Sequence, residues 1–108
     1  KIMSEHPLID GHNDIPWQYY KHVKDNISKM NFAVSQPQLQ TDIPRIHIGK
    51  LGAQFWSVFI PCGTPHAVNR TDMQIGVVQG LCKANPTAME CTYNASDIER
   101  VFPKRLPS

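Results

Sequence analysis

The chain has 108 residues, of which 41% are apolar and 19% are charged, and its formal net charge is +2 at pH 7. This length allows one small domain, and the composition is that of a globular protein rather than a disordered one. Acidic and basic residues are interspersed, so the sequence shows no footprint for nucleic-acid binding. No apolar run approaches the ~20 residues of a membrane-spanning helix. No signal-peptide pattern opens the chain, and residues 1–3 suit a mature or trimmed start.

The first predicted element is a strand over residues 7–14, which begins with an apolar pair and ends in a polar tip. Pro16 cannot continue a strand ladder, but it suits the first turn of a helix, where its missing N–H would have no partner anyway. A helix is therefore expected directly after the tip. Its apolar stripe is formed by residues spaced three or four apart, namely Trp17, Tyr20, Val23 and Ile27.

The middle of the chain predicts a loop, a short helical turn and a second strand. Residues 29–40 are polar and are expected to form a loop, and residues 43–51 a helical turn and a connection. Residues 53–60 form a nearly continuous apolar run, which is typical of a strand covered on both faces in a parallel sheet. Phe55 and Trp56 in this run are expected to lie in the core.

Two helices are predicted in the last third of the chain. After a loop at residues 61–65, a helix is expected from about residue 66 to residue 83, before Asn85 and Pro86 end it. Residues 92–101 suit a further short helix, with Ser96 as N-cap and Glu99 three residues later. Alternating strands and helices indicate an α/β fold with a parallel sheet. The apolar stripe expected on the longer helix is Val68, Ile75, Val78 and Cys82.

The polar tip of the first strand carries the candidate site. Side chains two apart on an extended chain point to the same face, so His12 and Asp14 should project together. An imidazole and a carboxylate that converge at a strand end form part of a hydrolytic metal site. Asp10 is expected to form local hydrogen bonds instead. The other histidines lack a second ligand pair at metal-binding spacing and are not assigned to a metal: His6, His22, His47 and His66.

Glycosylation and cysteine patterns favour the secretory pathway or an extracellular location. Asn26, Asn69 and Asn94 each open an Asn-x-Ser/Thr sequon, and the chain has three cysteines, so at least one of them lacks an internal partner. A buried, reduced thiol remains an equal alternative for Cys82. The pairing of Cys82 with Cys91 stays open. Ser57 and the cysteines lack a neighbouring base that would make one of them a catalytic nucleophile.

Two blocks of sequence resemble the membrane (renal-type) dipeptidases, a family of zinc peptidases. The first block is residues 8–17 (LIDGHNDIPW), and the second comprises residues 41–45 (TDIPR) and 49–62 (GKLGAQFWSVFIPC). Residues 72–102 resemble the family more loosely. The resemblance covers nearly all of this chain, as an N-terminal portion over residues 1–102, whereas residues 103–108 form a divergent tail. It spans only about the first third of a full-length family member.

The resemblance implies a (β/α)8 barrel of the TIM type, of which this chain holds the opening βα units. It also implies that His12 and Asp14 bind one of two zinc ions, while a bridging glutamate and two further histidines come from later strands. Cys62 would form a disulfide with a residue outside this chain. Family members hydrolyse dipeptides and are commonly lipid-anchored to membranes, but no catalytic residue beyond the two ligands falls within these residues.

Two functional hypotheses follow. The first is the N-terminal part of a zinc dipeptidase with a two-metal mechanism, inactive as the isolated 108-residue chain. The alternative is a truncated, non-catalytic secreted protein that acts as a binding module. In both cases two βα units cannot close a barrel, so the edge of the second strand and the apolar helix faces should remain exposed. The remainder of the barrel, a second copy or another chain would have to cover them.

Overall fold

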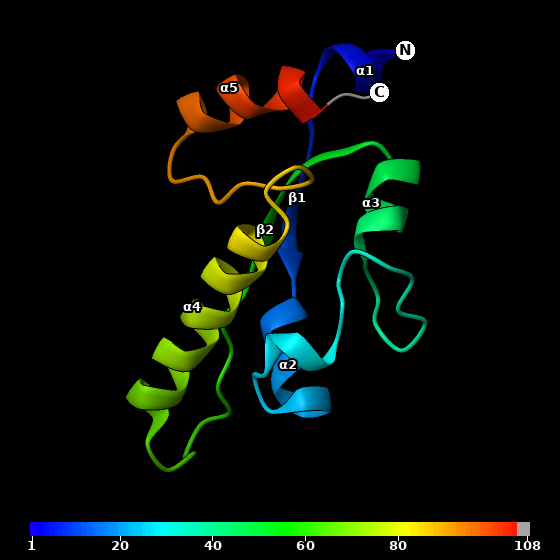
Figure 1. The fold of residues 1–108 in the computed structure, drawn as a ribbon. Helices are drawn as coiled ribbons and strands as arrows, with labels where there is room; N and C mark the ends of the chain where they lie inside the picture. Colours follow the sequence, from blue (N-terminus) through cyan, green and yellow to red (C-terminus); the bar gives the residue numbers. More distant parts are fainter. Residues whose placement is uncertain (106–108) are drawn as a thin grey trace.

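A computed structural model describes residues 1–105 of the chain. Two strands, β1 and β2, pair in parallel, with Leu8 opposite Leu51 and Asn13 opposite Trp56. Figure 1 shows α2 at the end toward which β1 points, and α1 and α5 at the opposite end. The expected α/β fold with a small parallel sheet is confirmed. The elements are α1 (Ile2–Glu5), β1 (Leu8–Asn13), α2 (Ile15–Val23), the 3-10 helix η1 (Ile27–Lys29), α3 (Ile43–Ile48), β2 (Leu51–Trp56), α4 (Ala67–Ala84) and α5 (Ala95–Arg105).

Helix α2 begins directly after β1, with Pro16 in its first turn as expected. The predicted apolar stripe is confirmed only in part. Val23 and Ile27 pack against the core, but the fully buried side chains of α2 are Ile15, Pro16 and Tyr19. The helix also ends before Ile27. Lys24 and Asp25 adopt left-handed backbone conformations, with φ of 53° and 67°, and this turn separates α2 from η1.

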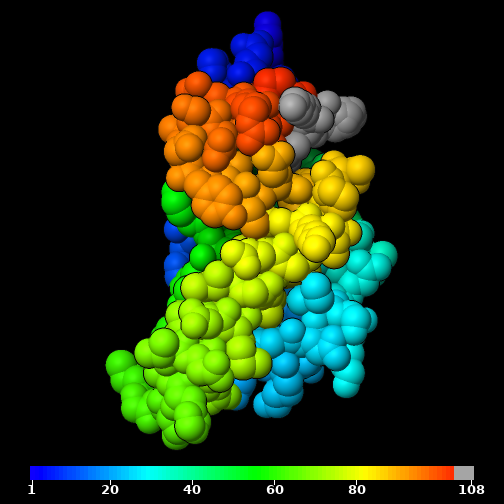
Figure 2. All heavy atoms as spheres, turned by 60° about the vertical axis from the view of Figure 1, so that its left-hand side comes forward, coloured from blue at the N-terminus to red at the C-terminus, as the bar shows by residue number. Residues whose placement is uncertain are grey.

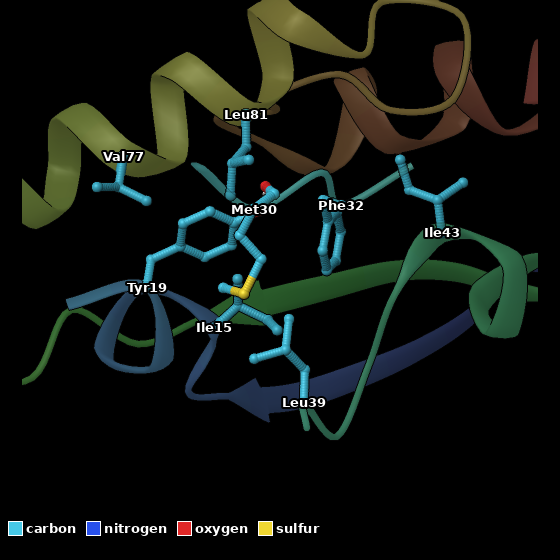
Figure 3. Packing of buried hydrophobic residues seen from close by; sticks show 8 residues of the cluster. All are labelled: Ile15, Tyr19, Met30, Phe32, Leu39, Ile43, Val77 and Leu81. Carbon is cyan, nitrogen blue, oxygen red and sulfur yellow. Dashed lines mark hydrogen bonds between the residues drawn. The ribbon is translucent and has the colours of Figure 1, made fainter. Parts of the chain in front are cut away.

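The hydrophobic core lies between α2, α4 and the segment that joins η1 to α3 (Figure 3). The segment predicted as a polar loop has little regular structure but supplies three buried side chains, Met30, Phe32 and Leu39. Tyr19 anchors it, since its hydroxyl donates to the Met30 carbonyl at 2.7 Å. Burial raises the pKa of Tyr19 to about 12. The rest of the core cluster is Ile15, Ile43, Val77 and Leu81.

Strand β2 is displaced from the predicted strand, which was expected to run from residue 53 to residue 60. It begins at Leu51 and ends at Trp56, because β1 turns into α2 after Asn13 and offers no further ladder partner. The last bond between these segments runs from the Ser57 N–H to the Asn13 carbonyl at 2.8 Å. Phe55 is 62% exposed, contrary to the expected core position. Trp56 is half-buried and packs edge-on against Phe32.

Helix α4 matches the predicted helix in extent but not in the face it buries. Its buried side chains are Gln74, Val77 and Leu81, whereas Val68 on the predicted stripe is 80% exposed. The other residues of that stripe line an open apolar hollow between α4 and β2, to which Phe55 and Val58 also contribute. Both faces of α4 therefore carry apolar residues, and only one of them packs on the core. The stripe residues in the hollow are Ile75, Val78 and Cys82.

Helix α5 starts earlier than its predicted N-cap. The Asn94 side chain accepts a hydrogen bond from the Asp97 N–H at 2.9 Å, so Asn94 rather than Ser96 caps the helix. The Asp97 carboxylate in turn accepts from the Tyr93 N–H at 3.0 Å. The helix continues through Pro103 to Arg105, and residues 106–108 of the predicted tail lie outside the described residues.

A disulfide joins Cys82 near the end of α4 to Cys91 in the segment before α5, with their Cα atoms 5.9 Å apart. Cys82 is therefore not the reduced thiol considered as an alternative. The bond fixes the segment between the two helices against α4 and forms part of the wall of the apolar hollow. Cys62 is a free, exposed cysteine, and its pairing with a residue outside this chain stays a prediction.

The sheet is open to solvent on much of its surface. Leu8 and Ile9 in β1 are 45% and 47% exposed, although both are large and apolar. Figure 2 shows α4 and α5 along one face of the molecule, with the segment of residues 20–40 beside α4. Among residues 1–105, no helix combines the length and the hydropathy that crossing a membrane requires.

Candidate functional site

His12 and Asp14 converge at the carboxyl end of β1. The His12 Nε2 atom lies 3.0 Å from the Asp14 Oδ1 atom, and the two side chains are 65% and 50% exposed. Asp14 occupies the N-cap position of α2, yet its carboxylate makes no capping hydrogen bond there. The carboxylate instead faces the imidazole. Both donor atoms are thus accessible from solvent, and they lie close together as predicted, although Asp14 lies just beyond the end of β1.

A chain of hydrogen bonds connects this tip to β2. Asp10 accepts from the His12 N–H at 3.4 Å and from the Gln54 side-chain amide at 2.7 Å. The Gln54 carbonyl oxygen accepts from the Trp56 indole N–H at 2.8 Å. Asp10 therefore makes the expected local hydrogen bond to the His12 backbone, and its shorter bond comes from Gln54 in the neighbouring strand.

Asn13, between the two candidate ligands, is fixed on both sides. Its side-chain amide donates to the Thr41 hydroxyl at 2.7 Å, and its carbonyl accepts from the Ser57 N–H at 2.8 Å. The tip is thus tied to the segment before α3 and to the end of β2. These bonds restrict the backbone of the tip while the His12 and Asp14 side chains remain accessible.

The donor set fits part of one zinc shell. Two ligand atoms at ~2.0 Å from a tetrahedral zinc ion are roughly 3.3 Å apart, a little more than the observed 3.0 Å contact. A catalytic zinc normally takes three protein ligands. Within residues 1–105 no group of three or more His, Cys, Asp or Glu side chains could hold a metal ion. The pair could therefore complete a site only with ligands from elsewhere.

Asp42 is a buried carboxylate that sequence reasoning missed. It caps α3, because its Oδ1 accepts from the Arg45 N–H at 3.0 Å, and its Oδ2 accepts from the Arg45 Nε at 2.9 Å. The Gln36 N–H also donates to Oδ2 at 2.8 Å. The Arg45 side-chain hydrogen bond is the main reason that the pKa of Asp42 falls to about 2. An aspartate directly before Ile43 and Pro44 is a recognisable helix start, and this signal could have identified it.

Arg45 extends the Asp42 interaction to the loop between η1 and α3. One of its terminal nitrogens donates to the Gln36 carbonyl at 3.0 Å and to the Leu39 carbonyl at 2.9 Å. Leu39 is 1% exposed and belongs to the core. Asp42 and Arg45 therefore hold the long loop that carries core side chains. Thr41, the partner of Asn13, is the neighbour of Asp42, so the same cluster supports the candidate site.

The three sequon asparagines are all exposed. The Asn26 side-chain oxygen accepts from the Ser28 N–H and hydroxyl, at 3.1 and 2.6 Å. Asn94 caps α5 through its side-chain oxygen, and Asn69 lies in α4. The hydrogen bonds of Asn26 and Asn94 use the side-chain oxygen and not the nitrogen to which a glycan would be attached, so these exposed positions stay candidates, as does Asn69.

Comparison with known proteins agrees with the two sequence blocks. The family model described as membrane dipeptidase, peptidase family M19, matches residues 1–106. Dipeptidase 3 of Macaca fascicularis is 38% identical over 102 residues, which cover 90% of this chain and 20% of that protein. Dipeptidase 3 of Mus musculus is 36% identical over 90 residues, which cover 79% of this chain and 17% of that protein.

A relative from a distant organism matches the same region. An uncharacterized dipeptidase of Schizosaccharomyces pombe is 33% identical over 115 residues, which cover 94% of this chain and 28% of that protein. The chain thus spans less than a third of the length of these curated relatives. The matches include the strand that carries His12 and Asp14. The chain belongs to the membrane dipeptidase family, peptidase family M19.

Proposed function

We propose that this chain is the N-terminal portion of a zinc-dependent dipeptidase and that His12 and Asp14 are two of its metal ligands. The observation that carries the proposal is the 3.0 Å approach of His12 Nε2 to Asp14 Oδ1 at the carboxyl end of β1. In (β/α)8 barrels the active site lies at this end of the strands. The parallel pairing of β1 and β2 supports their assignment as the first two strands of such a barrel.

In this proposal each residue has a defined task. His12 would hold an ion through Nε2 and Asp14 through Oδ1, the two atoms that contact each other at 3.0 Å in this structure. Zinc ions, when bound as a pair, supply a Lewis acid for the scissile carbonyl of a dipeptide and a water that is activated for attack. Asp10 and Asn13 hold the strand tip through their bonds to Gln54 and Thr41. The remaining ligands come from outside these 108 residues.

The exposed apolar surface supports a covering partner. Leu8, Ile9 and Phe55 are each between 45% and 62% exposed, which is unusual for large apolar side chains of a sheet. We assign this cover to the remainder of the barrel. A second copy or another protein chain would be the cover if the chain acts as a non-catalytic binding module.

Zinc titration tests the ligand assignment. We expect the 108-residue chain to bind zinc weakly and His12→Ala to lower the affinity at least about tenfold, since even the loss of an outer-shell partner costs that much. His22→Ala is the matched control, because His22 is exposed on α2 and has no role in the pair. Isothermal titration calorimetry measures both. Equal zinc affinity of the His12→Ala variant and the parent chain would contradict the assignment.

Extracellular or secretory origin is also part of the proposal. The Cys82–Cys91 disulfide and the three exposed sequons both suit an oxidising compartment. We expect at least one of Asn26, Asn69 and Asn94 to carry a glycan in protein from its natural source. Mass spectrometry before and after enzymatic deglycosylation measures this directly. Three unmodified asparagines in that material would count against a secretory origin.

A further inference from the structure

Gln74 is a buried polar side chain in the middle of α4, and it is 1% exposed. Its carboxamide bonds to both backbone groups of a single residue. The Phe59 N–H donates to Gln74 Oε1 at 2.9 Å, and Gln74 Nε2 donates to the Phe59 carbonyl at 2.6 Å. A carboxamide in this position does for Phe59 what a neighbouring strand does for a ladder residue.

The Gln74–Phe59 interaction lies just beyond the end of the sheet. Phe59 lies three residues beyond the end of β2, where β1 has already turned into α2 and no ladder partner remains. Gln74 therefore provides the hydrogen-bond partners that the sheet does not provide for the N–H and carbonyl groups of Phe59. This explains why the apolar run can leave the sheet at Trp56 and still keep a defined path toward α4.

The same interaction places the Phe59 ring against α2. The Phe59 ring lies edge-on to Trp17, with centroids 5.4 Å apart, and Trp17 stacks on Tyr20 at 5.3 Å. Arg70, one turn before Gln74 on α4, lies 4.5 Å from the centre of the Tyr20 ring. Two side chains on one face of α4 thus hold an aromatic cluster, defined as Trp17, Tyr20 and Phe59.

We propose that Gln74 is a positioning residue for the His12–Asp14 pair. Trp17 lies in the first turn of α2, and Asp14 is the N-cap position of the same helix. By holding Phe59 against Trp17, Gln74 fixes where α2 begins and therefore where the Asp14 carboxylate lies relative to His12. The metal role of the pair rests on the proposed function, but the positioning is a property of the chain without zinc.

The unmodified chain provides the first test. The Phe59 amide lies outside the sheet, so without Gln74 it would exchange its hydrogen with solvent like a loop amide. We expect its exchange, followed by NMR, to be at least about tenfold slower than that of an unbonded loop amide. Exchange at the rate of a loop amide would overturn the proposal.

A charge-dependent variant provides the second test. In Gln74→Glu the introduced carboxyl is buried, which raises its pKa above that of an ordinary glutamate. When protonated it can accept from the Phe59 N–H and donate to the Phe59 carbonyl, whereas the ionised form repels that carbonyl. Between pH about 5 and about 8 we expect one shared titration, absent from the parent chain, in the Phe59 amide, the Trp17 indole N–H and the Asp14 amide resonances.

Gln79→Glu is the matched control, because Gln79 is exposed on the same helix and the charge change is the same. It should leave those resonances as they are in the parent chain at each pH. A titration confined to Phe59 and Trp17, or none beyond the control, would overturn the positioning role. These NMR measurements need no zinc. They therefore test the role of Gln74 separately from the zinc titration, which tests His12 as a ligand.

Discussion

Replacing Asp42 with alanine should destabilise the chain by about 3 kcal/mol. The change removes the N-cap of α3, worth about 1 kcal/mol, and leaves the Gln36 N–H and the Arg45 Nε without their acceptor. Asp42 is fully buried, so water does not readily replace the lost oxygens. Urea unfolding followed by circular dichroism measures the free-energy difference.

Asp72→Ala is the control for this variant, since Asp72 is an exposed aspartate on α4. It should change the free energy of unfolding by less than about 0.5 kcal/mol. A destabilisation of the Asp42→Ala variant no greater than that of the control would show that the Arg45 network contributes nothing to stability.

The same carboxylate predicts a pH dependence. Its pKa is 3.8 when unperturbed and about 2 in the folded chain, so the unfolded state binds the proton more readily. The stabilisation is fully present above the unfolded value and is lost as pH falls from about 4 toward the folded pKa of about 2. The Asp42→Ala variant should lack this component of acid unfolding.

The second large effect concerns catalysis. Purified 1–108 chain supplied with zinc should hydrolyse no dipeptide measurably, because one histidine and one carboxylate fill only part of a catalytic zinc shell. A longer protein that adds the missing ligands should hydrolyse dipeptides. In that protein His12→Ala should lower kcat/KM by more than about 100-fold, more than the loss of an outer-shell partner.

The comparison uses one simple dipeptide and matched zinc concentrations, and His22→Ala serves again as the control in the longer protein. Robust hydrolysis by the 1–108 chain, removed by a chelator and restored by zinc, would contradict the prediction that the isolated chain is inactive. It would mean that residues other than His12 and Asp14 complete a metal site within this chain.

The order of the two strands and of helices α2 to α5 could be predicted because local signals mark it, whereas α1 and η1 were not predicted. Pro16 after a polar tip predicted the boundary between the first strand and the first long helix. Asn85 and Pro86 predicted the end of α4. The buried face of α4 could not be predicted, because Val77 and Val78 offer apolar rows on both sides. The buried face also includes Gln74, a polar residue whose carboxamide is satisfied by two hydrogen bonds to the Phe59 backbone.

The candidate site also combines a feature that could be predicted from the local sequence with features that could not. The two-residue spacing correctly predicted that His12 and Asp14 converge, but the backbone between them is not a continuous strand. Strand β1 ends at Asn13, and Asp14 is the N-cap position of α2, with φ of −98° and ψ of 28°. The supports of the tip arise from residues far away in the chain. Gln54 bonds to Asp10 across 44 positions, and Thr41 bonds to Asn13 across 28. The first contact depends on the parallel register of β1 and β2, and the second on the path of the loop before α3, and no local pattern encodes either.

The uncovered sheet also bears on how this chain behaves in solution. Strand β1 exposes nearly its whole length, including the neighbouring Leu8 and Ile9. An exposed strand at the edge of a two-stranded sheet, with an apolar pair on it, can pair with other extended chains, which leads to aggregation. Folding yield and chaperone binding, rather than the free energy of the native state, would then set how much of this chain accumulates in a cell.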